Sequence, residues 1–71
     1  MSILIEHKQL KEYLAIWRAG NRLSITEAGA RLGVHRNLYR HWELGHCLPH
    51  GANLQRVMIE LRLRIEEIYF G

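Results

Sequence analysis

Apolar residues along the chain recur three and four positions apart, and no alternating pattern typical of a β-strand persists for more than a few residues. The first apolar repeat lies in LIEHKQLKEYLAIWRAG, residues 4–20, where Leu10, Leu14 and Trp17 share one helical face. The final glycine of this segment is a typical helix stop. The pattern predicts an amphipathic first helix.

The second apolar repeat, SITEAGARLG at residues 24–33, begins with a helix-start signature. Ser24 and Glu27 have the spacing of a capping box, in which each side chain binds the backbone amide of the other residue. The residues expected on the buried face are Ile25, Ala28, Gly29 and Leu32. Gly29 costs about 0.5–1 kcal/mol relative to Ala in a helix interior. We therefore expect another helix to cross Gly29 so closely that no side chain fits.

The third segment, GVHRNLYRHWELG at residues 33–45, separates polar from aromatic residues around a helix. Tyr39 and Trp42 fall on one side and are expected in the core, with Leu38 at its edge. Leu38 could instead contact a thymine methyl group, but the core is the expected place. The opposite arc carries Arg36, Asn37, Arg40 and His41. This polar arc is either a solvated face or a surface that contacts a partner.

The C-terminal part follows a loop, HCLPHGAN, and is expected to be either one bent helix or two short helices with a break near Arg62–Leu63. The fold class is then all-α, a compact bundle of four to five short helices in a single domain spanning residues 1–71. Residues 52–70 carry more apolar side chains than so small a core needs, which favours a two-fold dimer contact there. Its expected members are Leu63, Ile65, Ile68, Tyr69 and Phe70. The alternative is a surface helix with many salt bridges.

Composition narrows the class of protein. The chain has 71 residues, 48% hydrophobic and 24% charged, and a net charge of +3, which favours a polyanionic partner. A single cysteine, Cys47, allows no internal disulfide and is consistent with a reducing compartment. We see no signal peptide or membrane span and expect a cytoplasmic protein without a membrane partner. With no catalytic triad, carboxylate pair or phosphate loop, we expect no enzyme, no cofactor and no small-molecule effector.

Histidine is frequent around Cys47. His41, His46, Cys47 and His50 lie within ten residues, and imidazole and thiolate groups are ligands that zinc prefers. The segment has no second ligand pair at zinc-finger spacing, so we expect no bound metal. His46 and His50 are interpreted as loop residues near a phosphate backbone, and Cys47 as a half-buried small residue.

Two short helices joined by the turn LGV, the second with a polar and cationic arc, are typical of a helix-turn-helix, here over residues 24–44. In that arrangement the first helix lies across the phosphates and the second places its N-terminal residues against base edges in the major groove. Arg can bond guanine O6 and N7, and Asn can pair with adenine N6 and N7. The pattern therefore favours double-stranded DNA as the partner.

Residues 23–49, LSITEAGARLGVHRNLYRHWELGHCLP, resemble the Cro/lambda-repressor type (XRE-like) of helix-turn-helix DNA-binding domain. The resemblance is carried by the Leu-Ser entry, the small residue Gly29, the turn LGV, and the W-E-x-G ending followed by a proline. A weaker similarity extends over about residues 10–70, and Arg18 falls where the family has a first-helix arginine. The resemblance implies a lambda-repressor-like fold.

Roles for individual residues are also implied by the resemblance. The side chains implied to face bases are His35, Arg36, Asn37 and His41, with Arg40 near a base or a phosphate. Arg18 is implied to pair with Glu43 and so to tie the first helix to the end of the recognition helix.

For function, the resemblance implies a sequence-specific transcriptional regulator, a repressor of its own promoter, that binds an inverted-repeat operator as a homodimer. Such small proteins are frequent in phages and mobile elements, Cro-like regulators and anti-CRISPR-associated autorepressors among them. The alternative is the antitoxin of a toxin–antitoxin pair, in which the last helices cover a toxin while the helix-turn-helix represses the operon.

Overall fold

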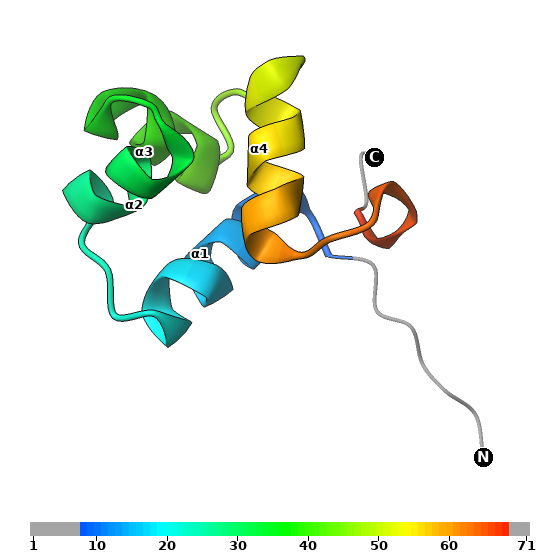
Figure 1. Cartoon of the computed structure of the whole chain (residues 1–71), viewed down its shortest axis with the longest axis horizontal. Helices are drawn as coiled ribbons and strands as arrows, with labels where there is room; N and C mark the ends of the chain where they lie inside the picture. Colours follow the sequence, from blue (N-terminus) through cyan, green and yellow to red (C-terminus); the bar gives the residue numbers. More distant parts are fainter. Residues whose placement is uncertain (1–7, 69–71) are drawn as a thin grey trace.

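A computed structural model describes residues 8–68, which form four α-helices followed by one short 3-10 helix (Figure 1). The bounds are α1 Leu10–Gly20, α2 Ile25–Leu32, α3 Arg36–Leu44, α4 Ala52–Leu61 and the 3-10 segment Ile65–Glu67. The all-α class and the number of helices expected from the sequence are confirmed for these residues.

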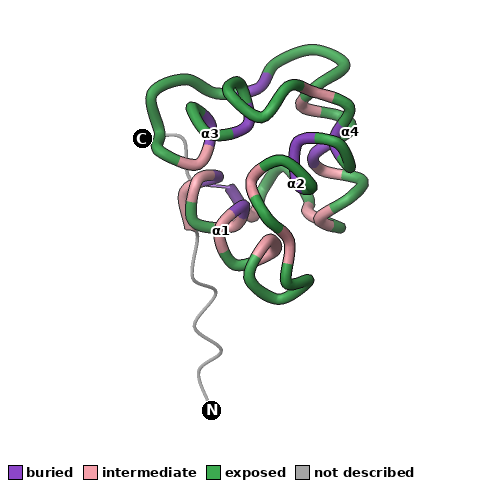
Figure 2. Tube along the Cα trace, turned by 90° about the vertical axis from the view of Figure 1, so that its left-hand side faces the viewer, coloured by how far each residue is buried: buried purple, intermediate pink, exposed green. Residues whose placement is uncertain are grey.

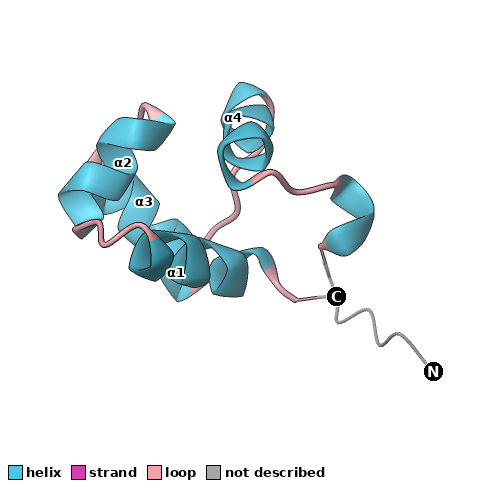
Figure 3. Ribbon diagram, turned by 60° about the horizontal axis from the view of Figure 1, so that its bottom comes forward, coloured by secondary structure: helices cyan, strands magenta, loops and turns pink. Residues whose placement is uncertain are grey.

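The helices are arranged around α1, which runs beneath the others in Figure 1. α3 packs against both α1 and α2, and α4 also contacts both α1 and α2. Figures 1 and 3 place the 3-10 segment on the opposite side of α4 from α2 and α3. The surface around α3 is therefore well separated from the C-terminal segment.

Every α-helix contributes to one small core, seen as the purple stretches of Figure 2. The buried hydrophobic residues are Leu10, Leu14, Ala28, Leu32, Tyr39, Trp42, Val57 and Ile68. Burial of a Leu, Ile or Val side chain contributes about 1.5–3 kcal/mol to the free energy of unfolding relative to leaving it exposed. The face predicted for α2 and the aromatic face predicted for α3 are both confirmed.

α1 begins later than the periodic pattern predicted. Its first residue is Leu10, whereas the predicted segment starts at residue 4, and residues 4–7 lie outside the described part. Gln9 has an extended backbone, and Lys8 pairs with Ile68 in a single parallel β-bridge. The chain just before α1 is therefore extended and lies beside the distant C-terminal segment, a contact that periodicity does not report.

α2 has the predicted capping box. The Ser24 Oγ accepts the Glu27 backbone N–H at 3.1 Å, and the Glu27 carboxylate accepts the Ser24 N–H at 3.0 Å. Close approach at Gly29 is also present, but the neighbour is a turn rather than a crossing helix. A Cβ at this position would lie 2.8 Å from the Val34 carbonyl oxygen and 3.3 Å from the Arg36 Cα. The missing side chain thus allows the turn and the start of α3 to fold back tightly onto α2.

The predicted break near Arg62–Leu63 is confirmed. α4 ends at Leu61, and Arg62 adopts a left-handed conformation with φ 54°. The chain then forms the 3-10 segment instead of a fifth α-helix, and the Tyr13 hydroxyl donates to the Glu67 carbonyl at 2.9 Å. This contact and the Lys8 bridge hold the C-terminal segment against the start of α1.

Candidate nucleic-acid interface

The polar arc predicted for α3 is exposed along the whole helix. The exposed residues of this arc, with those that precede and follow the helix, are His35, Arg36, Asn37, Arg40, His41 and His46. The opposite face is fixed because Tyr39 and Trp42 are buried in the core, where α3 packs against α1 and α2. The two burial patterns set the rotation of α3, so its donor groups face outward together. We refer to these six residues as the α3 polar surface.

The start of α3 is capped by His35, which the sequence had marked as a DNA-facing residue. Its Nδ1 accepts a hydrogen bond from the Asn37 backbone N–H at 3.1 Å. The imidazole thereby takes the role of the Ser or Asn oxygen that more often caps a helix. Histidine is a poor helix cap compared with Ser or Thr, so the sequence favours a DNA contact over a capping role for His35, but the ring nitrogen does cap α3.

α3 ends at Leu44, and the next residue, Gly45, has a φ of 79° in the left-handed region. The chain then turns back, and His46 contacts His41 edge-on with ring centroids 5.6 Å apart. A Cβ at Gly45 would lie 2.9 Å from the Lys11 Cδ, so the lysine stem of α1 crosses this turn. The positive charge of Lys11 near the C-terminal end of α3 interacts favourably with the helix dipole.

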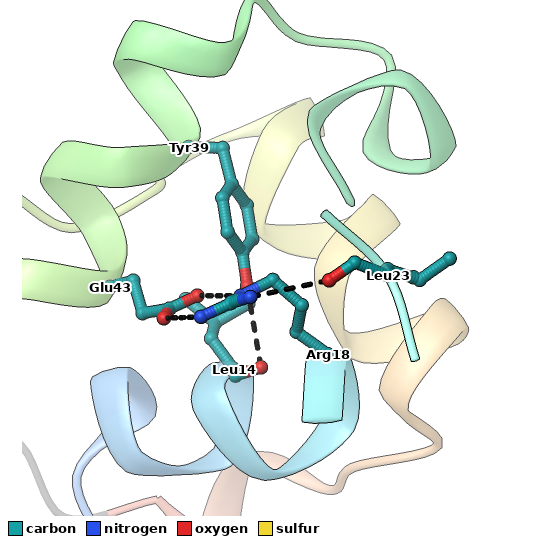
Figure 4. Close-up of polar contacts among 5 residues, drawn as sticks. All are labelled: Leu14, Arg18, Leu23, Tyr39 and Glu43. Carbon is teal, nitrogen blue, oxygen red and sulfur yellow. Dashed lines mark hydrogen bonds and ion pairs between the residues drawn. The ribbon is translucent and has the colours of Figure 1, made fainter. Parts of the chain in front are cut away.

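The implied pairing of Arg18 with Glu43 is present and ties α1 to α3 (Figure 4). Arg18 Nε donates to Glu43 Oε2 at 2.9 Å, and Nη2 donates to Oε1 at 2.7 Å. Arg18 Nη1 also donates to the Leu23 carbonyl at 3.2 Å. These hydrogen bonds lower the pKa of Glu43 and raise that of Arg18, so the pair stays ionised at neutral pH.

Tyr39 lies directly above this pair in Figure 4 and reaches the same helix. Its hydroxyl donates to the Leu14 carbonyl at 3.3 Å, which satisfies a buried polar group, and burial raises its pKa. Tyr39 and Glu43 therefore both fasten α3 to α1, from residues four positions apart on one helix.

A further contact, from α4, was not predicted from the sequence. Arg56 Nη2 donates to the Arg31 carbonyl at 3.2 Å, and its guanidinium lies beside Gly33 in the turn between α2 and α3. A cation at the C-terminal end of α2 satisfies a carbonyl that has no partner within the helix. From the sequence, the arginines of the C-terminal part were expected only to form salt bridges on a surface helix. No local pattern distinguishes Arg56 from the other arginines there.

Two residues near α3 differ from the expectation. Leu38 is 38% exposed rather than buried, and Cys47 is exposed rather than half-buried. Both border a shallow hollow of about 100 Å³ that Trp42, Leu48 and Pro49 also line. Tyr39 and Trp42 are 0% and 2% exposed and form the core face of α3, which leaves Leu38 at its edge.

The residues expected at a dimer contact differ in how far they are exposed. Ile68 is only 6% exposed, so its apolar surface is used within the chain and the expectation is wrong for this residue. Leu63 packs against the core, Ile65 is 53% exposed, and Tyr69 and Phe70 lie outside the described residues.

An open apolar groove of about 200 Å³ was not anticipated, and we refer to it as the α1–α4 groove. The residues that line it are Tyr13, Ile16, Trp17, Leu61 and Leu63.

Within residues 8–68 no group of three or more His, Cys, Asp or Glu side chains is placed to hold a metal ion. In the same range no helix has the length and apolar character needed to cross a bilayer. Comparisons with family models, with curated proteins and with solved structures found no match to this chain.

Proposed function

We propose that this chain is a sequence-specific double-stranded-DNA-binding protein, a transcriptional repressor that acts as a homodimer on an inverted-repeat operator. The observation that carries the proposal is the α3 polar surface, held in place by α2, a three-residue turn and the Arg18–Glu43 pair. This is the arrangement of a helix-turn-helix, and α3 is its recognition helix. The resemblance to the Cro/lambda-repressor family supports the same proposal.

The chemistry of α3 matches what a recognition helix needs. An α-helix fits the major groove, and the start of α3 offers Arg36 and Asn37 with no competing partner within the described residues. Arg40 lies one turn further along and is equally exposed. Because α3 is anchored at Tyr39, Trp42 and Glu43, these donors are presented by a rigid element, which favours sequence readout over loose electrostatic binding.

The charge of the chain supports the same partner. A net charge of +3 favours association with a phosphate backbone, and the exposure of His46 just after α3 supports a phosphate contact there. A dimer would present two copies of α3 to half-sites about 34–36 Å apart, one turn of B-DNA. Binding over a promoter then excludes polymerase without any catalytic step.

Fluorescence anisotropy tests the proposal. The duplex is the DNA directly upstream of the gene, the competitor is a shuffled duplex, and binding is measured at about 50 and 200 mM salt. We expect wild-type protein to keep its preference for the upstream duplex at the higher salt. Arg36→Ala and Arg40→Ala should reduce that preference.

Arg64→Ala is the matched control, because it removes one positive charge from the exposed segment on the far side of α4 from α3. It should leave the preference unchanged. Equal binding of both duplexes that collapses together at 200 mM salt would refute sequence-specific recognition.

A second candidate function is that of an antitoxin that covers a protein partner. The α1–α4 groove favours it, because Ile16, one of the apolar residues that line it, is 57% exposed. Co-expression with the product of the neighbouring gene distinguishes the two. A stable complex that survives size-exclusion chromatography supports the antitoxin, whereas a homodimer alone supports the simple repressor.

A further inference from the structure

His35 differs from the usual capping residues because its ring carries a second nitrogen beyond the one that caps. Nδ1 accepts the Asn37 backbone N–H at 3.1 Å. A neutral imidazole has one donor nitrogen and one acceptor nitrogen. Because Nδ1 is the acceptor, the ring proton lies on Nε2, and Nε2–H is a hydrogen-bond donor.

This donor is available to a partner. The His35 side chain is exposed, and within residues 8–68 the one hydrogen bond of its ring is the contact of Nδ1 with Asn37. Arg36 and Asn37, the next two residues, are exposed as well. A duplex that contacts those two side chains also passes within reach of the His35 ring.

Resting on the proposed function, we propose that His35 is a specificity-determining residue that donates Nε2–H to an acceptor on the major-groove edge of one base pair in each half-site. Guanine presents N7 and O6 on that edge, adenine presents N7 and thymine presents O4, whereas cytosine presents the N4 amino donor. Beside N7, guanine carries the O6 acceptor whereas adenine carries the N6 amino donor, so a single N–H donor aimed at N7 favours guanine over adenine. It finds no acceptor on cytosine.

The cap explains why the His35 ring offers a hydrogen-bond donor to the base, at Nε2, and not an acceptor. Turning the ring over, or moving the proton to Nδ1, would leave the Asn37 N–H without its partner and α3 without its cap. The same contact restricts the ring before DNA arrives, so less side-chain freedom is lost on binding. A serine in this place would also cap α3, but its hydroxyl lies at the cap and reaches no further.

Two substitutions separate the cap from the contact. His35→Ser keeps a capping oxygen but removes the imidazole Nε2–H donor, whereas His35→Ala removes both the cap and the Nε2–H donor. The full chain is measured on an operator duplex enriched from a random library, with each of the four base pairs placed in turn at every half-site position. A thermal melt of each variant shows that α3 is still folded.

We expect His35→Ser to lose discrimination at one position in each half-site, by roughly 3- to 10-fold in Kd, the range of a single hydrogen bond. All other positions keep their preference. Replacing the contacted guanine by 7-deazaguanine, which lacks N7, should weaken wild-type binding and leave the His35→Ser variant unaffected. Nitrogen-15 NMR of the free protein should show the His35 proton on Nε2.

Several results would overturn the proposal. An equal loss for His35→Ser on all four base pairs would assign the ring to a phosphate, and wild-type affinity for that variant would assign it to the cap alone. A proton on Nδ1 in the free protein would remove the fixed donor. If wild-type protein enriches no sequence, the proposed function fails and this proposal fails with it. If an operator is enriched but one of the other results is found, the function stands without the role of His35.

Discussion

The Arg18–Glu43 pair allows a quantitative test of how α3 is held. Glu43→Gln keeps the size of the side chain and removes its charge, so one amide oxygen accepts where two carboxylate oxygens did. Two charge-assisted hydrogen bonds of 2.9 and 2.7 Å are affected, and a hydrogen bond to a charged group contributes about 1.5–3 kcal/mol. The loss is reduced because the Arg18 side chain is 29% exposed and keeps its bond to the Leu23 carbonyl.

We therefore expect the free energy of unfolding to fall by about 2 kcal/mol, less than the roughly 3–5 kcal/mol typical when a fully buried pair is broken. For a chain of this size that is a drop of about 8–16 °C in Tm. Urea unfolding followed by circular dichroism measures the free energy, and a thermal melt measures Tm. Glu60→Gln is the control, since Glu60 is exposed on α4 and should change stability by less than about 0.5 kcal/mol.

The pH dependence gives a second, independent signature. Hydrogen bonds from Arg18 lower the pKa of Glu43 below its ordinary value of 4.5. As the pH falls below that value the unfolded state takes up the proton first, so the stabilisation by Glu43 is lost progressively in acid. The difference between wild type and Glu43→Gln should be full above about pH 5.5 and should shrink below pH 4.5. A loss no larger than that of the control, or one that does not change with pH, would refute this role of the pair.

Four further substitutions test the packing and the surface. Gly29→Ala should destabilise the fold by about 1–3 kcal/mol, because its Cβ would lie 2.8 Å from the Val34 carbonyl oxygen. Gly20→Ala, with open space around it, should stabilise the fold by about 0.4–1 kcal/mol. Chemical denaturation measures both, and equal effects of the two substitutions would contradict the close approach at Gly29. Ser24→Ala should cost about 1 kcal/mol in the same assay, and an unchanged midpoint would mean that the capping box does not stabilise α2. Arg36→Ala should weaken binding to the operator by about 1–3 kcal/mol and relax preference at one base pair, and an unaltered binding-site profile would remove Arg36 from direct readout.

The parts of this fold that depend on neighbouring residues were predicted closely from the sequence. α2 begins after the Ser24 cap, and α2 and α3 end immediately before the glycines that close their sequence segments, Gly33 and Gly45, both in the left-handed conformation. The rotation of α3 was also predicted, because Tyr39 and Trp42 lie on one face by spacing alone. Caps, turn residues and helical periodicity act over a few residues, so a single sequence reports them.

The parts that depend on contacts between distant segments were not predicted. Lys8 forms a β-bridge with Ile68 just before α1 begins, and Arg56 donates to the Arg31 carbonyl from 25 residues away. Leu38, at the edge of the core face, is 38% exposed although the core was its expected place. The Arg18–Glu43 pair spans a similar distance and was anticipated through the family resemblance rather than from local pattern.

Selection from a random duplex library tests the central claim most directly. The full-length chain is incubated with the library at about 200 mM salt, the bound fraction is amplified over several rounds, and the enriched duplexes are sequenced. The account predicts one enriched motif, an inverted repeat whose half-site centres lie about 34–36 Å apart, and loss of that enrichment in Arg36→Ala but not in Arg64→Ala. A library that stays random after selection, with both variants binding as the wild type does, would contradict a sequence-specific DNA-binding role for α3.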